Sequence, residues 1–317
     1  MMICHMAGAQ NPVVIHYVDE NVGYRYNHVA TWVNNATLRS EPSRNATAIE
    51  TIPIGTICSL IKPGKDTVEI AGIQSPWYYL EANGKRGWIW GGLLTRACVG
   101  SNVHPEIKFL LGYQLYDDIK GEGFKQTFMQ LRAIKNHEEI ASISFPLLEP
   151  MFEFSNAGSK GLEGIEDILS VVQSGESCGH FSGSSMILWD GKKFYDPLVI
   201  GGVADGDYSV WDSPIFPADM EGEKDYLILD SEDYNSYESF EEESNGYVME
   251  RIAKQTYMKW EKGTWKEDQS RFQSKTLYYI VNGTIGENYY SEDQQILPNA
   301  IDATILDWIN SHKRMQK

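Results

Sequence analysis

Cysteine chemistry is the first possibility that the sequence raises, because Cys178 and His180 lie close together in the run 177–180. A cysteine hydrolase pairs a thiolate with a histidine that a polar group orients, and its thiol often stands at a helix N-terminus. Here the chain passes through a short Gly-Ser stretch into an expected strand, Ser184–Trp189, and not into a helix. His180 is also too close in sequence to act easily on the Cys178 sulfur. The pattern favours a structural or disulfide cysteine in a turn.

Other catalytic patterns are weaker. The run Gly183-Ser184-Ser185 lacks the strand-turn-helix elbow of a serine hydrolase. Carboxylates are many, but they cluster in polar surroundings where nothing would raise the pKa of a glycosidase acid. Neither GxxxxGK[ST] nor GxGxxG after a strand occurs, which disfavours nucleotide-dependent enzymes. We therefore predict no catalytic residue and no cofactor.

A calcium loop is a further possibility at Asp205-Gly206-Asp207, where two carboxylates flank a turn glycine and Asp212 is nearby. The same residues also make an ordinary turn, and the full spacing of a calcium loop is absent. The four cysteines show no CxxC pair and no zinc-ligand spacing. No metal site is predicted, and calcium binding by Asp205 and Asp207 is left open.

Aromatic side chains are the remaining candidates. They alternate along expected strands, so each run sends some rings to a core and others outward; Trp88 and Trp90 share one face of a strand, and Ile89 takes the other. An exposed set would form a flat apolar patch suited to stacking on sugars or peptide side chains. The alternative is that these rings are core residues of a small barrel. The candidate ligand-binding residues are Trp32, Tyr79, Trp88 and Trp90.

The elements that carry these rings lie between Thr31 and Leu94. An apolar run breaks into a polar loop with Pro42, and a corner at Ile54-Gly55-Thr56 precedes another apolar run. Two aromatic runs, 77–82 and 85–90, are separated by Asn83-Gly84, the pair best able to form a type I′ turn. Short antiparallel strands are therefore expected throughout this stretch.

In its order of motifs this stretch resembles a bacterial SH3 domain. One departure is a longer connection over Lys62–Pro76, which could be an extra hairpin or a cover for part of the surface. The resemblance implies an SH3-like barrel over residues 28–96 and binding of cell-wall peptide or another envelope protein. The motifs that carry it are Leu38-Arg39-Ser40, Pro42-Ser43, Ile54-Gly55-Thr56, Trp77-Tyr78, Asn83-Gly84-Lys85 and Gly87-Trp88-Ile89.

The larger remainder, residues 105–317, follows a connection over Thr95–Pro105 and is expected to be rich in antiparallel β-strands, in a sandwich or similar sheet. Turns at Asp190-Gly191 and Glu261-Lys262-Gly263 predict two more hairpins, the second with a longer turn. The expected strands cover Ile107–Tyr116, Thr127–Ile134, Glu139–Phe145, Ser184–Trp189, Lys192–Asp196, Tyr226–Leu229, Tyr247–Ile252, Thr256–Trp260, Thr264–Lys266 and Thr276–Val281.

Three segments break this pattern. The spacing of apolar residues in Leu162–Val172 suits either a helix or a strand. Ile301–His312 carries an apolar stripe at helical spacing and basic residues at its end, which predicts a C-terminal helix packed on the sheet. Asp225–Asn245 alternates acids with Tyr and Ser, which is typical of a mobile acidic loop.

The charge balance limits the classes of partner. The chain of 317 residues has a formal net charge of −17, from 44 acidic and 27 basic residues. Such a field repels a phosphate backbone and an anionic membrane surface, so a nucleic-acid partner is disfavoured. No apolar run approaches the roughly 18 to 20 residues that span a bilayer, so no membrane span is expected.

The N-terminal tail, residues 1–27, contains Ala7-Gly8-Ala9, which fits the small-residue cleavage pattern of a secretory signal peptide. An ordinary small-residue tail is the alternative. Export would remove Cys4 and allow one disulfide, for which Cys98 with Cys178 is the first choice. The cysteines that would remain are Cys58, Cys98 and Cys178.

Together these features predict a mainly β protein, periplasmic or secreted, that acts as a non-enzymatic binding protein of the bacterial cell envelope. The alternative is an SH3-targeted cell-wall hydrolase with its active site in the C-terminal part, and a third possibility is an interaction protein whose partner is another exported protein. Hydrogen-bond reach between Cys178 and a histidine would favour the hydrolase.

Overall fold

The computed structural model describes residues 13–14, 18–19, 23–24, 28–70, 72–115, 127–149, 151–175, 179–205, 208–238, 246–282 and 295–296. Within these ranges the chain folds into antiparallel sheets, and the short 3-10 turn η1 (Gly91–Leu93) is the one helical element, so no described helix could span a membrane. The prediction of a mainly β fold is confirmed. The predicted C-terminal helix over Ile301–His312 lies outside the described residues.

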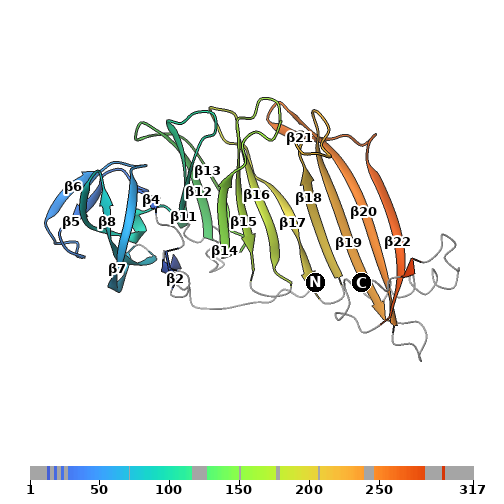
Figure 1. Cartoon of the computed structure of the whole chain (residues 1–317), viewed down its shortest axis with the longest axis horizontal. Helices are drawn as coiled ribbons and strands as arrows, with labels where there is room; N and C mark the ends of the chain where they lie inside the picture. The colour runs from blue at the N-terminus through green and yellow to red at the C-terminus, as the bar shows by residue number, and fades with distance from the viewer. Residues whose placement is uncertain are drawn as a thin grey trace, which may run out of the picture.

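The first sheet is curled into a half-barrel at the blue end of the molecule (Figure 1). Its interior is lined by alternate side chains such as Leu38, Leu80 and Ile89, all fully buried, because successive residues of a strand face opposite sides. The predicted turn Asn83-Gly84 is formed, with φ of 52° and 73°. Its strands, in spatial order, are β4 (His28–Ala30), β7 (Ile57–Ile70), β8 (Ile73–Ala82), β9 (Lys85–Trp90), β5 (Ala36–Arg39) and β6 (Ala48–Ile52), with β1 (Val13–Val14) parallel to β8. A separate pair joins β2 (Val18–Asp19) and β3 (Gly23–Tyr24).

The long connection over Lys62–Pro76 is an extension of the β7–β8 hairpin. Its register shifts twice, between Leu60 and Lys62 and again between Pro63 and Thr67, and pairing then continues to the end of the hairpin. The extension lies against Trp90, whose indole Nε1 donates to the carbonyl oxygen of Val68 at 3.2 Å. The segment therefore covers part of the aromatic face of the half-barrel.

The second and third sheets make up the rest of the described chain, and the predicted strands are present apart from Lys192–Asp196. The second sheet contains β10 (Ala97–Gly100), β11 (Ile107–Leu115), β12 (Thr127–Lys135) and β13 (Glu138–Pro146). The third contains, in order, β14 (Met151–Asn156), β15 (Asp167–Ser174), β16 (Phe181–Trp189), β17 (Leu198–Asp205), β18 (Tyr208–Ile215), β19 (Leu227–Glu238), β20 (Gly246–Glu261), β22 (Gln273–Asn282) and β23 (Gln295–Ile296), with β21 (Thr264–Glu267) paired to β20.

Two predicted hairpins differ from the structure in detail. After β16 the chain turns at Asp190-Gly191 as predicted, and the carboxylate of Asp190 accepts hydrogen bonds from the backbone N–H groups of Lys192 and Lys193. Only a single bridge, between Trp189 and Phe194, forms across this turn in the described chain, and residues 181–186 of β16 pair with β17. The turn after β20 is shorter than predicted, because Glu261 pairs directly with Thr264 across two residues of positive φ. The ambiguous segment Leu162–Val172 is resolved as turns followed by β15.

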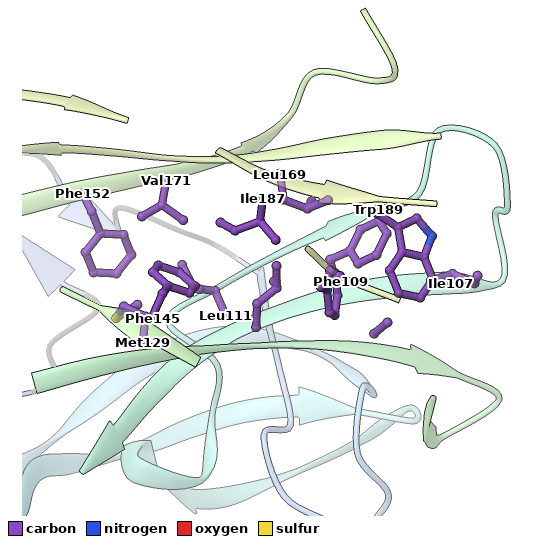
Figure 2. Close-up of a cluster of buried hydrophobic side chains, with 13 residues drawn as sticks. Ile107, Phe109, Leu111, Met129, Phe145, Phe152, Leu169, Val171, Ile187 and Trp189 are labelled. Carbon is purple, nitrogen blue, oxygen red and sulfur yellow. The ribbon is translucent and has the colours of Figure 1, made fainter. Parts of the chain in front are cut away.

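The second sheet packs face to face on β14–β16 of the third sheet, which confirms the predicted sandwich (Figure 2). Side chains from the two layers point toward one another, and Trp189 lies with its ring centroid 5.5 Å from that of Phe109 and 4.7 Å from that of Phe194. Aromatic contacts of this kind add to the burial of apolar area that holds two sheets together. The buried residues of this core are Ile107, Phe109, Leu111, Met129, Leu131, Ala133, Phe145, Phe152, Leu169, Val171, Ile187, Trp189 and Phe194.

The prediction of a mobile loop over Asp225–Asn245 is wrong for residues 227–238, which form β19 between β18 and β20; residues 239–245 lie outside the described chain. Two of the acids of β19 have cross-strand ion-pair partners on β20. Glu232 is paired with Arg251, and its neighbour Asp233 is paired with Lys254. Consecutive strand residues face opposite sides, so each face of the sheet carries one of these ion pairs.

The half-barrel contacts the second sheet through a small shared core and through polar bonds. Lys108 Nζ donates to the carbonyl oxygen of Gly55 at 2.9 Å, and His137 Nδ1 lies 2.8 Å from the carbonyl oxygen of Ile54. Strand β10 lies inside the predicted connection Thr95–Pro105 and pairs with β11, so the connection itself belongs to the second sheet. The shared core consists of Ala30, Trp32, Ile54, Leu110 and Ile134.

Candidate functional site

Two of the four predicted ligand-binding aromatics are buried. Trp32 is 8% exposed and lies in the core shared with the second sheet, where the Arg132 guanidinium carbon is 3.9 Å from its ring centroid. Trp90 is 6% exposed, and its indole Nε1 also donates to the carbonyl oxygen of Ser75 at 3.0 Å. The structure therefore places Trp32 and Trp90 in packing positions, away from a common surface.

The other two aromatics are brought together. Tyr79 on β8 and Trp88 on β9 are directly opposed in the register, and their ring centroids are 5.3 Å apart with the planes inclined at 52°. Both side chains are half-buried, so each keeps part of its ring at the surface. The pair lies on the outer side of the half-barrel, since the intervening residues Leu80 and Ile89 fill its interior. We call these two residues the aromatic pair.

A basic side chain flanks the aromatic pair on each side. Lys62 opposes Tyr79 in the register of β7 and β8, and its Nζ lies 5.7 Å from the Tyr79 centroid and 5.9 Å from the Trp88 centroid. On the far side, Arg39 opposes Trp88 in the register of β5 and β9. Directly opposed residues point to the same face of a sheet, so these side chains form one row across four strands. In order, the row is Lys62, Tyr79, Trp88 and Arg39.

Neither cation of this row has an ion pair with a carboxylate of the described residues. Arg39 Nη1 donates to the carbonyl oxygen of Ala46 at 2.8 Å, which leaves the remaining guanidinium donors for other acceptors. The nearest acid along β8, Glu81, accepts instead from Arg86 Nε at 2.8 Å, and this bond raises the pKa of the Arg86 guanidinium. The row can therefore accept an acidic group without displacing an existing partner.

A second cluster surrounds His180. Its Nδ1 lies 3.2 and 3.1 Å from the two carboxylate oxygens of Glu149, a residue that is only 8% exposed, and Glu149 also accepts from the backbone N–H of Phe181 at 2.9 Å. The fully buried Gln173 accepts from the N–H of Leu148 at 2.8 Å, which fixes the backbone beside Glu149. His180 is thus oriented by a carboxylate, while Cys178 lies outside the described residues.

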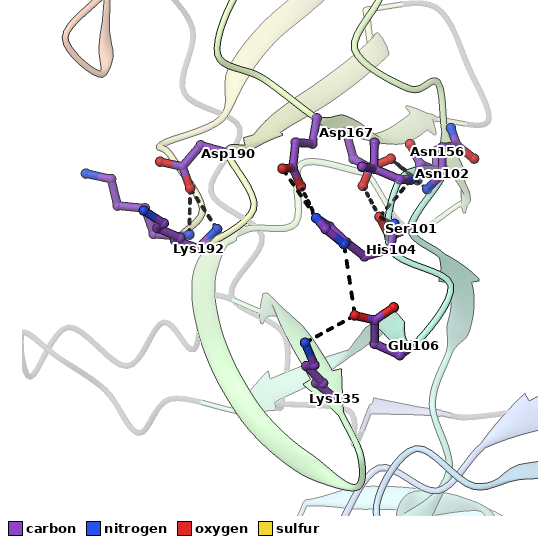
Figure 3. Close-up of polar contacts among 12 residues, drawn as sticks. Ser101, Asn102, His104, Glu106, Lys135, Asn156, Asp167, Asp190 and Lys192 are labelled. Atoms are coloured by element: carbon purple, nitrogen blue, oxygen red, sulfur yellow. Dashed lines mark hydrogen bonds and ion pairs between the residues drawn. The ribbon is translucent and has the colours of Figure 1, made fainter.

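A third cluster, around the end of the connection, is a network of hydrogen bonds and ion pairs (Figure 3). Ser101 Oγ donates to Asp167 Oδ2 at 2.5 Å and accepts from the backbone N–H of His104 at 3.0 Å. The His104 ring lies away from Ser101, with Nε2 3.2 Å from a carboxylate oxygen of Glu166 and Nδ1 4.0 Å from Glu106. This arrangement fastens the connection to β15 and does not form a catalytic triad.

Of the two carboxylates in the possible calcium loop, only Asp205 belongs to the described residues, and it is the last residue of β17. Asp207 lies outside the described residues. Among the residues that the structure describes, no group of three or more His, Cys, Asp or Glu side chains could hold a metal ion. Calcium binding by Asp205 and Asp207 therefore stays untested.

The disulfide predicted between Cys98 and Cys178 is not formed, because Cys98 is a free thiol. Cys58 is also free and fully buried in the half-barrel, opposite Val29 of β4. Burial raises the pKa of the Cys58 thiol to about 12, with a smaller contribution from Cys98. Both thiols are packing residues here, and neither resembles an activated nucleophile.

The comparisons with known proteins add no relative: no family model, no curated protein and no solved structure matches this chain. The functional reading therefore depends on the residues alone. Sequence reasoning missed Lys62 and Arg39, which strand registers bring to Tyr79 and Trp88. It also missed Glu149, which lies in the loop between β13 and β14 and reaches His180 just before β16. The motif Leu38-Arg39-Ser40 entered only through the resemblance to a bacterial SH3 domain, and the charge of Arg39 gave no separate signal. No short-range pattern links Glu149 to His180, which are 31 residues apart.

Proposed function

We propose that this chain is a non-enzymatic binding protein of the bacterial cell envelope, and that the aromatic pair Tyr79–Trp88 is where the half-barrel binds its ligand. The observation that carries the proposal is that these two predicted ligand-binding residues lie together at the surface, flanked by Lys62 and Arg39. The resemblance of residues 31–94 to bacterial SH3 domains supports a cell-wall peptide as the ligand, and another envelope protein is the second choice.

The chemistry of the pair suits this role. Half-buried aromatic rings offer a rigid apolar surface whose ordering costs little side-chain entropy, since the surrounding strands already hold them. Peptide backbones and sugar rings both stack on such surfaces. A location outside the cytoplasm follows from this ligand, in keeping with the small-residue run Ala7–Ala9, so the proposal includes a periplasmic or secreted protein.

Co-sedimentation with purified peptidoglycan tests the proposal. The full chain is expected to sediment with the polymer, and Trp88→Ala or Tyr79→Ala is expected to reduce the bound fraction. Trp211→Ala and Tyr208→Ala are matched controls, because both rings are 39% exposed and lie on β18, far along the third sheet. Equal loss in these controls would show non-specific adsorption and overturn the assignment to the aromatic pair.

A cell-wall hydrolase is the second candidate, and one observation favours it: the orientation of His180 by the carboxylate of Glu149. A cysteine hydrolase uses a histidine that a third polar group orients in this way. Release of soluble muropeptides over time, abolished by Cys178→Ala and reduced by Glu149→Gln while co-sedimentation is unchanged, would replace binding by hydrolysis as the function. Binding without release supports the non-enzymatic proposal. The absence of both binding and release would indicate that the partner is a protein.

A further inference from the structure

The row across the half-barrel combines two kinds of recognition. Its centre is the aromatic pair, and its ends are the cations Lys62 and Arg39. Both cations lack an ion pair with any carboxylate of the described chain, although the protein as a whole has a net charge of −17. The row therefore carries a local positive charge on a protein whose overall charge is strongly negative.

We propose that this row binds a peptide that carries free carboxylates, with the apolar part of the peptide on the aromatic pair and its carboxylates on Lys62 and Arg39. This inference rests on the proposed function and names the chemical class of its ligand. Arginine offers a planar fork of donors that matches a carboxylate, and lysine contributes a mobile point charge.

The geometry limits the size of the ligand. Adjacent strands are about 4.8 Å apart, so the four-strand row spans about 14 Å between the backbones of Lys62 and Arg39. The Lys62 ammonium leans inward over both rings of the aromatic pair. A carboxylate bound to Lys62 would lie above the rings, and one bound to Arg39 would lie at the other end of the row, where Arg39 Nη1 donates to the carbonyl oxygen of Ala46. A peptide of two or three residues with two carboxylates has the matching dimensions.

Other ligand classes fit less well. A cationic group on the aromatic pair would face Lys62 and Arg39 and be repelled, and a neutral glycan would leave both cations without a counter-charge. A long polyanion such as RNA would extend beyond the row into the field of the remaining acids, which disfavours it. A short acidic peptide is attracted by Lys62 and Arg39 and does not extend far enough to be repelled by the acids elsewhere on the protein.

The experiment titrates the full chain with the synthetic peptide N-acetyl-Ala-γ-D-Glu-Lys(N-acetyl) as the free acid and as the diamide, following tryptophan fluorescence and heat of binding. The free acid is expected to bind about tenfold or more tightly than the diamide, with affinity that falls as salt rises. Lys62→Gln and Arg39→Gln should each weaken binding of the free acid several-fold. Each should also reduce the ratio of the affinity for the free acid to the affinity for the diamide. Lys65→Gln and Arg44→Gln, both exposed cations near the row but outside it, are the matched controls and should bind as the parent does.

The outcomes separate this inference from the proposed function. Equal binding of acid and diamide, lost in Trp88→Ala, would overturn the carboxylate inference and leave the aromatic pair as the binding site. Sedimentation with peptidoglycan but no binding of either peptide would also overturn it, in favour of the glycan. Binding of neither peptide and no sedimentation would overturn this inference together with the cell-wall ligand, and would leave another envelope protein as the partner. Thermal unfolding of each variant shows whether a lost signal reflects a lost fold.

Discussion

The guanidinium carbon of Arg132 lies 3.9 Å from the centroid of the Trp32 ring, and Arg132 Nη1 donates to the carbonyl oxygen of Trp32 at 3.2 Å. These two contacts join β12 of the second sheet to the half-barrel. The approach is close because Gly112 lies under the ring: a Cβ at that position would be 2.7 Å from Trp32 Cε2. Trp32 is therefore a joint between two parts of the molecule.

A double-mutant cycle on this joint is the first prediction. Arg132→Ala is expected to lower the free energy of unfolding by about 1 to 2 kcal/mol, because it removes a partly desolvated cation–π contact and a hydrogen bond. Trp32→Ala, which opens a cavity, should cost about 3 to 5 kcal/mol. Urea unfolding of both single variants and the double variant measures the coupling. Additive losses would show that the stacked geometry contributes nothing beyond the separate side chains.

Trp88 and Trp90 occupy the same face of β9, yet they should respond differently to truncation. Trp90→Ala is expected to destabilise the protein by about 3 to 5 kcal/mol, because this ring is 6% exposed and its indole N–H donates to the β7–β8 hairpin. Trp88→Ala should cost about 1 kcal/mol, in proportion to the smaller apolar area that it buries. Chemical unfolding and peptidoglycan sedimentation are measured on both variants. Trp90→Ala should lose more stability, and Trp88→Ala should lose more binding. A Trp88 variant as unstable as the Trp90 variant would contradict the surface position of Trp88.

The ion pairs of β19 and β20 predict a charge-swap rescue. Asp233→Lys or Lys254→Asp places like charges side by side and is expected to lower the free energy of unfolding by about 0.5 to 1 kcal/mol each, more at low salt. The double variant restores an opposite pair and should recover most of the loss. Urea unfolding at two salt concentrations measures this. If the double variant is as unstable as the sum of the single ones, Asp233 and Lys254 do not interact.

Glu232, on the other face of the same strand, adds a pH dependence. Burial opposes ionisation of its carboxyl, but the hydrogen bond from Tyr234 and the ion pair with Arg251 outweigh burial and lower its pKa. A folded-state pKa below the unfolded value means that this contribution is present above the unfolded pKa and is lost as the pH falls through the folded one. Arg251→Gln should therefore flatten the acid limb of stability against pH, which unfolding curves between about pH 3 and 6 can measure.

Local chemistry made much of the fold predictable. Asn83-Gly84 forms its turn because both residues adopt positive φ at little cost. The alternation of apolar and polar residues in β11 and β12 predicted strands with one buried face. The same logic failed over Asp225–Asn245, where acids on a strand resemble the composition of a loop. Their stability depends on Arg251 and Lys254, which are separated from Glu232 and Asp233 by about 20 residues and are aligned only by register.

The candidate site was predictable only in part, for the same reason. Tyr79 and Trp88 lie near one another on either side of a short turn, so their approach follows from the hairpin. Lys62 meets Tyr79 through a strand whose register shifts twice, and sequence spacing does not fix such shifts. Trp32 was assigned to a ligand because the sequence cannot show that Gly112, on another sheet, makes room for its ring.

The buried thiol of Cys58 gives the last prediction. Burial raises its pKa to about 12 in the folded protein, whereas an exposed thiol ionises near 9.0. The folded state thus holds a proton that the unfolded state loses, so the free energy of unfolding should fall between pH 9 and pH 12, by up to about 1.4 kcal/mol per pH unit. Burial also raises the pKa of the Cys98 thiol, so Cys98 contributes a slope of the same sign. Cys58→Ala, though less stable at neutral pH because of its cavity, should lose the Cys58 part of the slope, and Cys98→Ala should keep that part. Urea unfolding at a series of alkaline pH values measures how the free energy of unfolding changes with pH. In a separate experiment, iodoacetamide at pH 8 should leave Cys58 unmodified until urea exposes it. Rapid modification in the native state would show that this strand of the half-barrel opens.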